Sequence, residues 1–126
     1  MTYQQLLETD LQILGEAWNQ HLQAGGYARS TLTNYMATVR FFDEFLKSAG
    51  MPRDAANIRR EHVEAFIADL LNRRSPATAS ARYRALKTFW KWLIEEGEVK
   101  ESPLRNIKPP RVGIPQTPVM SIDDLR

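Results

Sequence analysis

The stretch RRSPATASARYRALKTFWKW, residues 73–92, decides the fold of this 126-residue chain. It carries six arginines and lysines, no acid, one phenylalanine and two tryptophans. Its apolar residues recur at helical spacing, Ser75 is a preferred N-cap, and Pro76 falls at the first helical position, where a missing backbone N–H costs nothing. The stretch therefore predicts a helix that begins after Ser75, runs to Glu96 and ends at Gly97.

This helix is predicted to have two different faces. On a helical wheel of about 100° per residue, one face carries a hydroxyl and three cations, namely Ser80, Arg84, Lys87 and Lys91. The opposite face is apolar and consists of Leu86, Phe89, Trp90 and Leu93, with Tyr83 at its edge. Arg82 is the exception, since its angle puts it on the apolar side. The wheel predicts a basic ridge toward solvent and the aromatic residues in a core.

Three further helices are predicted upstream, and no segment has the alternation of a strand. They cover residues 10–24, residues 30–48 with Ser30 as N-cap, and residues 60–73. The residues expected to face inward recur at helical spacing in each: Leu11, Leu14, Trp18 and Leu22; Tyr35, Val39, Phe42 and Leu46; Val63, Phe66, Ile67, Leu70 and Leu71. The sequence thus predicts an all-α domain of four helices over residues 1–101.

The amino-acid composition of the chain changes after Gly97. Five prolines fall within sixteen residues, which predicts an extended, semi-rigid linker rather than packed structure. The closing SIDDLR, residues 121–126, has the pattern of a capping box, with Ser121 as N-cap and Asp124 three residues later. We therefore interpret residues 102–126 as a linker followed by the start of a further helix that this chain does not complete.

Composition excludes several functional classes. The chain has no cysteine, so disulfides, thiolate metal sites and thiol nucleophiles are absent. His21 and His62 have no further ligand nearby, and no phosphate loop or nucleophile motif occurs, so we expect no metal, cofactor or small-molecule substrate. No apolar run reaches the roughly 20 residues of a membrane span, and no leader peptide is evident, so we expect a cytoplasmic protein.

Charge is unevenly distributed along the chain. Residues 1–26 contain three acids and no lysine or arginine, whereas residues 73–111 contain ten basic residues and four acids. Such asymmetry is typical of a protein that binds a nucleic acid or another anionic surface. The small residues at 77–81 and the stretch RSTLTN at 29–34 open two helices with hydroxyls flanked by arginines. Two helix starts of this kind fit the major groove of DNA.

Plainer interpretations of the same residues remain open. The basic ridge is equally typical of a solvated helix face, although such faces usually mix signs. Ser30 and Ser75 cap helices whether or not they also contact phosphate, and Trp90 is expected in the core. A helical interaction module whose basic face docks an acidic partner is the alternative to DNA binding, and a free-standing small regulator is another.

Three segments in order resemble the N-terminal core-binding domain of tyrosine recombinases, the family of phage integrases and Xer-like enzymes. They are YARSTLTNYMATVRFFDEFL (27–46), IRREHVEAFIADLL (58–71) and SPATASARYRALKTFWKWLIEEGEVKESPLRNIKPPR (75–111). The closing PVMSIDDLR (118–126) is similar to the lead-in of that family's catalytic domain. The resemblance thus implies that residues 102–126 are an interdomain linker and the start of a catalytic domain absent from this chain. Ser102, where Asn often precedes the proline, and Arg59, where a capping Thr is common, depart from the pattern.

The resemblance implies a four-helix, SAM-like orthogonal bundle that forms one half of a C-shaped clamp around a duplex. It also implies sequence-directed binding of double-stranded DNA, contacts with other recombinase protomers assembled on that DNA, and a domain that is monomeric in isolation. The second and fourth helices and the linker would supply the contacts, which assigns DNA binding to Arg29, Thr31, Thr33, Asn34, Arg74, Thr78, Ser80, Arg82, Arg84, Lys87, Lys91, Lys108 and Arg111.

The chemistry of the resembled family requires a tyrosine nucleophile and a His-x-x-Arg motif in the catalytic domain. Neither His21 nor His62 begins such a motif, and the tyrosines of this chain all lie in the binding half. We therefore expect this chain to have no catalytic residues and no DNA-cleaving activity of its own. The parent enzyme, by resemblance, would join DNA through a phosphotyrosine intermediate without a metal or nucleotide.

Overall fold

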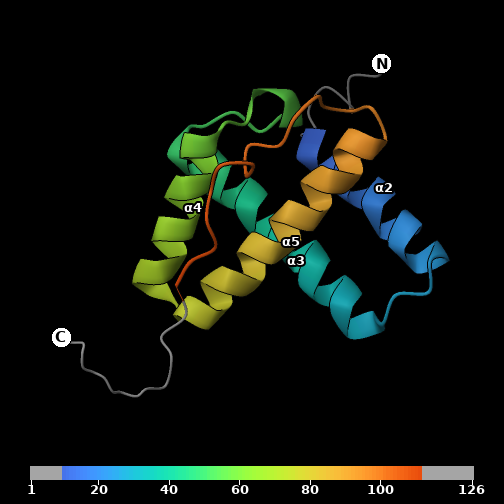
Figure 1. The fold of residues 1–126 in the computed structure, drawn as a ribbon, viewed down its shortest axis with the longest axis horizontal. Coiled ribbons are helices and arrows are strands. Elements are labelled where there is room, and N and C mark those ends of the chain that lie inside the picture. Colours follow the sequence, from blue (N-terminus) through green and yellow to red (C-terminus); the bar gives the residue numbers. More distant parts are fainter. Residues whose placement is uncertain (1–9, 112–126) are drawn as a thin grey trace.

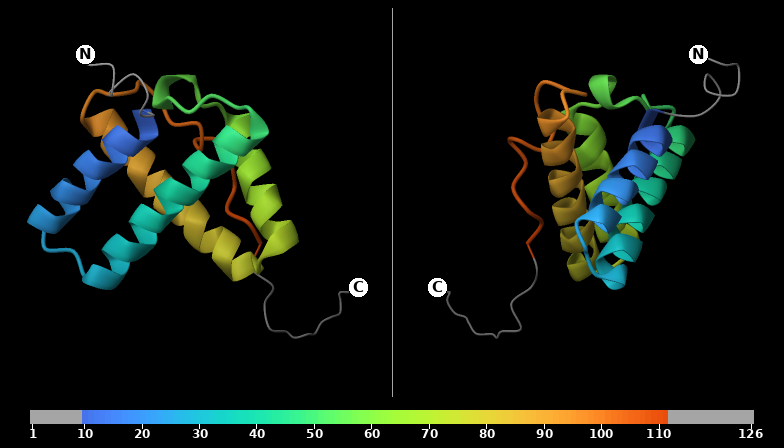
Figure 2. Two further views of the ribbon diagram at one scale, coloured as in Figure 1. Left: turned by 180° about the vertical axis from the view of Figure 1, so that it is seen from behind. Right: turned by 90° about the vertical axis from the view of Figure 1, so that its right-hand side faces the viewer.

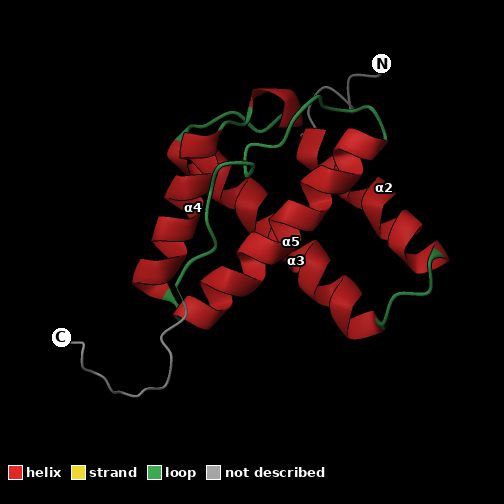
Figure 3. Cartoon of the chain, viewed as in Figure 1, coloured by secondary structure: helices red, strands yellow, loops and turns green. Residues whose placement is uncertain are grey.

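A computed structural model describes residues 10–111, which form four α-helices and one short 3-10 helix (Figures 1 and 3). The elements in chain order are α2 (Asp10–Ala24), α3 (Arg29–Ala49), η1 (Ala55–Asn57), α4 (Arg60–Arg73) and α5 (Pro76–Glu95). The described residues contain no strand, and none of their helices has the length and apolarity of a membrane span. The all-α prediction is confirmed, and each helix ends within one residue of its predicted bounds.

The helices form two pairs that cross. α2 packs beside α3, α4 packs beside α5, and α3 crosses α5 where the pairs meet (Figures 1 and 2). The first turns of α3 and α5 diverge from this crossing toward the same edge, which is the lower edge in Figure 1. Residues 29–38 of α3 and 76–84 of α5 are termed the fork below. The architecture therefore places two helix starts on one side of the molecule.

A series of aromatic contacts connects all four helices. Trp18 of α2 lies against Phe89 of α5 with ring centroids 4.8 Å apart, and Phe89 meets Trp90 edge-on at 5.4 Å. Trp90 then contacts Phe42 of α3 at 6.1 Å, and Phe42 contacts Phe66 of α4 at 5.0 Å. These tilted and edge-on geometries are the favoured ones for aromatic pairs. All five side chains are buried, as the sequence predicts for these positions.

Polar contacts hold the end of the bundle opposite the fork. Asp43 of α3 is buried and forms a two-pronged ion pair with Arg53, with nitrogen-to-oxygen distances of 3.0 and 2.9 Å. Asp10 at the start of α2 accepts a hydrogen bond of 2.9 Å from the backbone N–H of Ala55. The loop between α3 and α4 is thereby attached to both helices of the first pair.

Of the two predicted N-caps, one is present in the structure and one is not. Ser75 caps α5 as predicted, because its Oγ accepts the backbone N–H of Thr78 at 3.1 Å. The prediction for Ser30 is wrong, since α3 begins one residue earlier and Ala28 occupies the N-cap without a side-chain bond. The first helical hydrogen bond runs from Leu32 N–H to the Ala28 carbonyl, which leaves Ser30 inside the first turn.

The prediction that Leu71 lies in the core is also wrong. Leu71 is 41% exposed, whereas its neighbour Leu70 is 6% exposed and belongs to the core. Successive helical residues differ by about 100°, so the residue after a buried one can lie outside the buried face. Val63, Phe66 and Leu70 define the buried side of α4, and Leu71 lies beyond its edge.

The segment after α5 is packed where an extended linker was expected. Ser102 Oγ accepts the Leu104 N–H at 3.0 Å in a turn, and Leu104 is 1% exposed within the core. The Tyr83 hydroxyl donates to the Ile107 carbonyl at 2.6 Å. The expectation of an extended chain is therefore wrong for residues 102–107, because their apolar side chains pack on the helices.

Beyond Ile107 the described chain carries no further helix or turn and returns toward the start of α5 (Figure 1). The division of the chain at residue 101 remains a prediction. Two of the linker prolines and the helix start predicted at residues 121–126 lie outside the described residues.

Replacing Leu104 by alanine should lower the free energy of unfolding by about 2–5 kcal/mol, as expected for emptying a buried leucine site. Urea unfolding followed by circular dichroism measures this, and Asn106→Ala, at an exposed position of the same turn, should change it by less than about 0.5 kcal/mol. A Leu104→Ala protein as stable as the wild type would mean that residues 102–107 are not part of the folded unit.

Candidate nucleic-acid interface

The fork gathers most of the predicted contact residues at one edge of the molecule. Arg29 and Thr33 are exposed and Thr31 and Asn34 are half-buried in the first two turns of α3. The start of α5 lies at the same edge, and the described chain, which ends at residue 111, comes close to it in the views of Figures 1 and 2. Residues separated by up to about eighty positions in the sequence therefore share one surface.

The basic ridge of α5 is present, with one change in its membership. Arg84, Lys87 and Lys91 are exposed, and none has a carboxylate within 4 Å among the described residues. Ser80 was expected on this ridge, but it is only 5% exposed, so that prediction is wrong. Arg84 folds back over it and donates from Nη1 to the Ser80 Oγ at 2.7 Å. Ser80 therefore supports an arginine of the ridge.

The junction between α4 and α5 holds two arginines with different surroundings. Arg73 is neutralised by Asp69 at 2.8 Å, one turn earlier on α4. Arg74 is exposed and has no such partner among residues 10–111, and it directly precedes the capped start of α5. The free N–H groups and dipole of a helix N-terminus also favour an anion. Arg74 rather than Arg73 is thus the cation available to a ligand.

The side chain of Arg82 leaves α5 and joins α3. Its Nη1 donates to the Asn34 Oδ1 at 2.8 Å, to the Thr38 Oγ1 at 3.0 Å and to the Asn34 carbonyl at 3.3 Å. Thr38 is fully buried and its own hydroxyl donates to the same carbonyl at 2.9 Å. The structure thus explains why the helical wheel places this charged residue on the apolar side: it bridges the two helices of the fork.

Arg82 lies in an unusually cationic environment. Its guanidinium carbon is 5.2 Å from the centre of the Phe41 ring, and that of Arg40 is 4.9 Å from the same ring. Desolvation of the half-buried group lowers the pKa of Arg82, and the nearby charges of Arg74 and Arg40 lower it further. Arg40 and Phe41 were not among the predicted contact residues, because a single-helix wheel gives no sign that they meet α5.

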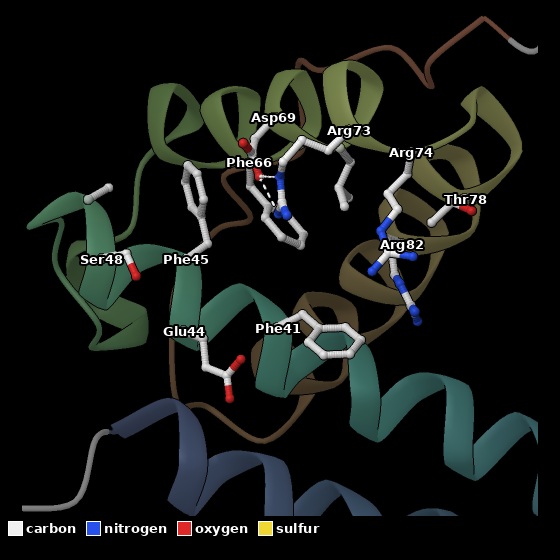
Figure 4. A pocket seen from close by; sticks show the side chains of 12 residues that line it. Phe41, Glu44, Phe45, Ser48, Phe66, Asp69, Arg73, Arg74, Thr78 and Arg82 are labelled. Carbon is white, nitrogen blue, oxygen red and sulfur yellow. Dashed lines mark hydrogen bonds and ion pairs between the residues drawn. The ribbon is translucent and has the colours of Figure 1, made fainter.

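A hollow of about 750 Å³ lies beside the fork, between α3 and α4 (Figure 4). Arg74, Thr78 and Arg82 gather at one end of it, while Phe45 and Ser48 lie at the other. Its lining mixes cations with Glu44, Asp69 and aromatic rings. The described residues contain no group of three or more acidic, His or Cys side chains that would hold a metal. The hollow thus continues the cationic surface at one end only.

Comparisons with known proteins agree with this architecture. The chain is 29% identical over 120 residues to the tyrosine recombinase XerD of Corynebacterium glutamicum. The aligned part covers 90% of this chain and 39% of that relative. It is 33% identical over 99 residues to the XerD of Caulobacter vibrioides, covering 78% of this chain and 32% of the relative. The chain therefore spans well under half the length of the curated relatives that it matches.

Among solved structures, the fold resembles that of a lambda integrase dimer bound to a COC′ core site. The TM-score is 0.68 over 82% of this chain and 29% of the integrase, at 17% sequence identity. The sequence profile of the phage integrase N-terminal SAM-like domain matches residues 14–98. This chain therefore belongs to the phage integrase family, and its helical bundle is the N-terminal SAM-like domain of that family.

Proposed function

We propose that this chain binds double-stranded DNA as the core-binding domain of a tyrosine recombinase. The observation that carries the proposal is the fork, where two helix starts lie at one edge and the basic ridge of α5 begins at Arg84. A helix start offers backbone N–H groups and a favourable dipole to phosphates, and the major groove of B-DNA admits a helix. The lambda integrase of similar fold was solved on DNA.

The roles within this interface follow from exposure and chemistry. Phosphate contacts are assigned to the exposed cations, and the hydroxyls of Thr31, Thr33 and Thr78 add donors at the helix starts. Beyond the fork, Lys108 and Arg111 extend the surface along the returning chain. The exposed cations of the interface are Arg29, Arg74, Arg84, Lys87, Lys91, Lys108 and Arg111. Residues of α3 and α5 that enter the groove contact the base edges.

The activity of the parent protein lies outside this chain in our proposal. Strand cleavage and joining belong to a catalytic domain, and this chain contributes binding and alignment of the DNA. Other recombinase protomers are its partners on DNA, and in isolation the domain is monomeric and cytoplasmic. No covalent step is assigned to any residue of residues 1–126.

Duplex binding should depend steeply on salt. If roughly five phosphates are neutralised, the affinity should fall by about two to three decades between 50 and 200 mM salt. Fluorescence anisotropy with a labelled duplex measures this, with polyglutamate as the competitor that represents an acidic protein partner. Salt-independent binding, or equal displacement by polyglutamate at matched charge, would instead support an interaction module.

Reversing the charge at Arg84 and Lys87 together should weaken duplex binding about a hundredfold or more, because two phosphate contacts become repulsive. Both side chains are exposed, so the melting temperature should change little. The matched control is the double reversal of Lys47 and Arg60, two exposed cations at the end of α3 and the start of α4, away from the fork. Equal loss of affinity in the control would mean that only net charge matters, and a collapsed fold in the first variant would mean that α5 is oriented differently.

A further inference from the structure

Arg82 differs from the three ion-paired arginines of the described chain in what it is bonded to. It also differs from Arg84, which is exposed and donates to the Ser80 hydroxyl of its own helix. Arg53, Arg73 and Arg105 each pair with a carboxylate. Arg82 is half-buried, yet all three of its acceptors are neutral oxygens, and they come from α3, up to 48 residues away in sequence. A buried charge without a counter-ion lowers stability unless its hydrogen bonds compensate. Sites that break such a rule are more often functional than accidental.

The bonds of Arg82 have two geometric consequences. They join the second turn of α5 to the second turn of α3, which sets the spacing between the two helix starts of the fork. They also fix the orientation of the Asn34 amide, because a guanidinium has only donors and must face the Oδ1. The amide nitrogen of Asn34 makes no hydrogen bond within residues 10–111, and the side chain is partly exposed. Asn34 is therefore held with its donor free.

We propose that Arg82 is a positioning residue for DNA binding, which acts through Asn34 and the spacing of the fork and not through a phosphate contact of its own. Asn34, so held, donates to an acceptor on the duplex, either a phosphate oxygen or a base acceptor such as guanine N7 or O6. This inference rests on the proposed DNA-binding function and changes the part that Arg82 plays in it. The Nη1 of Arg82 is already engaged by Asn34 and Thr38, and the guanidinium carbon lies over the face of Phe41.

The test is a double-mutant cycle with Arg82→Gln, Asn34→Ala and the two combined, each measured for melting temperature, duplex affinity and salt dependence. Each single change should weaken duplex binding about tenfold, and the double variant should lose little more, since both remove the same interaction. The slope of log affinity against log salt should stay unchanged in Arg82→Gln. In Arg84→Gln it should fall by about one, as for a lost phosphate contact.

Arg53→Gln is the matched control. It is the same substitution of an arginine bonded to α3, at the end of the bundle opposite the fork, and it leaves Asp43 buried without its partner. It should lower the melting temperature at least as much as Arg82→Gln does, while duplex affinity at a temperature where both proteins are folded stays within about twofold of wild type. This separates loss of stability from loss of positioning.

Asn34→Asp provides a second, independent readout. A carboxylate keeps and strengthens the bond to Arg82, so this variant should melt no lower than wild type. It removes the free donor and adds a negative charge, so duplex affinity should fall by more than tenfold. Wild-type affinity in Asn34→Asp would overturn the inference.

Additive losses in the cycle, or a salt slope that falls by one in Arg82→Gln, would show instead that Arg82 contacts DNA directly. The wild type and the Arg84→Gln variant report on the proposed function separately. If the wild type fails to bind duplex at low salt, DNA binding itself is wrong. If it binds and only the Arg82 results differ, the positioning role alone is wrong.

Discussion

The chain of ring contacts from Trp18 through Phe89, Trp90 and Phe42 to Phe66 is the interaction on which the remaining structure depends. It takes at least one aromatic side chain from each of the four helices. Because these rings are bulky and buried, α3 and α5 must cross where Phe42 meets Trp90. The crossing then sends the first turns of both helices out of the core toward one edge. The proposed DNA surface is therefore a consequence of how the core is packed.

The arginines of the domain divide according to this geometry. Away from the fork, Arg53 neutralises a buried carboxylate and stabilises the fold. On the ridge of α5, Arg84 is exposed and held only by a hydroxyl, so its charge remains available. Within the fork, Arg82 is bonded to neutral oxygens and crowded by other cations. Charge is compensated where the fold requires it and left uncompensated where an anionic ligand is expected.

Local patterns in the sequence predict most of the fold, and contacts between distant segments account for what they miss. Apolar periodicity and the Ser75-Pro76 signal predict the ends of each helix to within one residue. The same periodicity predicts most of the core residues. The wheel also places Arg82 correctly, but its acceptors lie 48 residues away on a helix whose crossing angle no local pattern encodes. The same reason explains Leu104, whose proline-rich surroundings indicate a linker although it packs into the core. The prediction that Ser80 is exposed is wrong because a helical wheel describes one helix and does not show the arginine that folds over this residue.

In the proposed function, the two helix starts of the fork together form the DNA surface. An NMR titration of the domain with a duplex at low salt tests it most directly, because backbone amide shifts report each residue separately. Our account predicts that the shifts cluster at residues 29–34 and 74–91 while amides near Asp10 and Arg53 stay unchanged. Shifts confined to α2, or spread evenly over the surface, would contradict it.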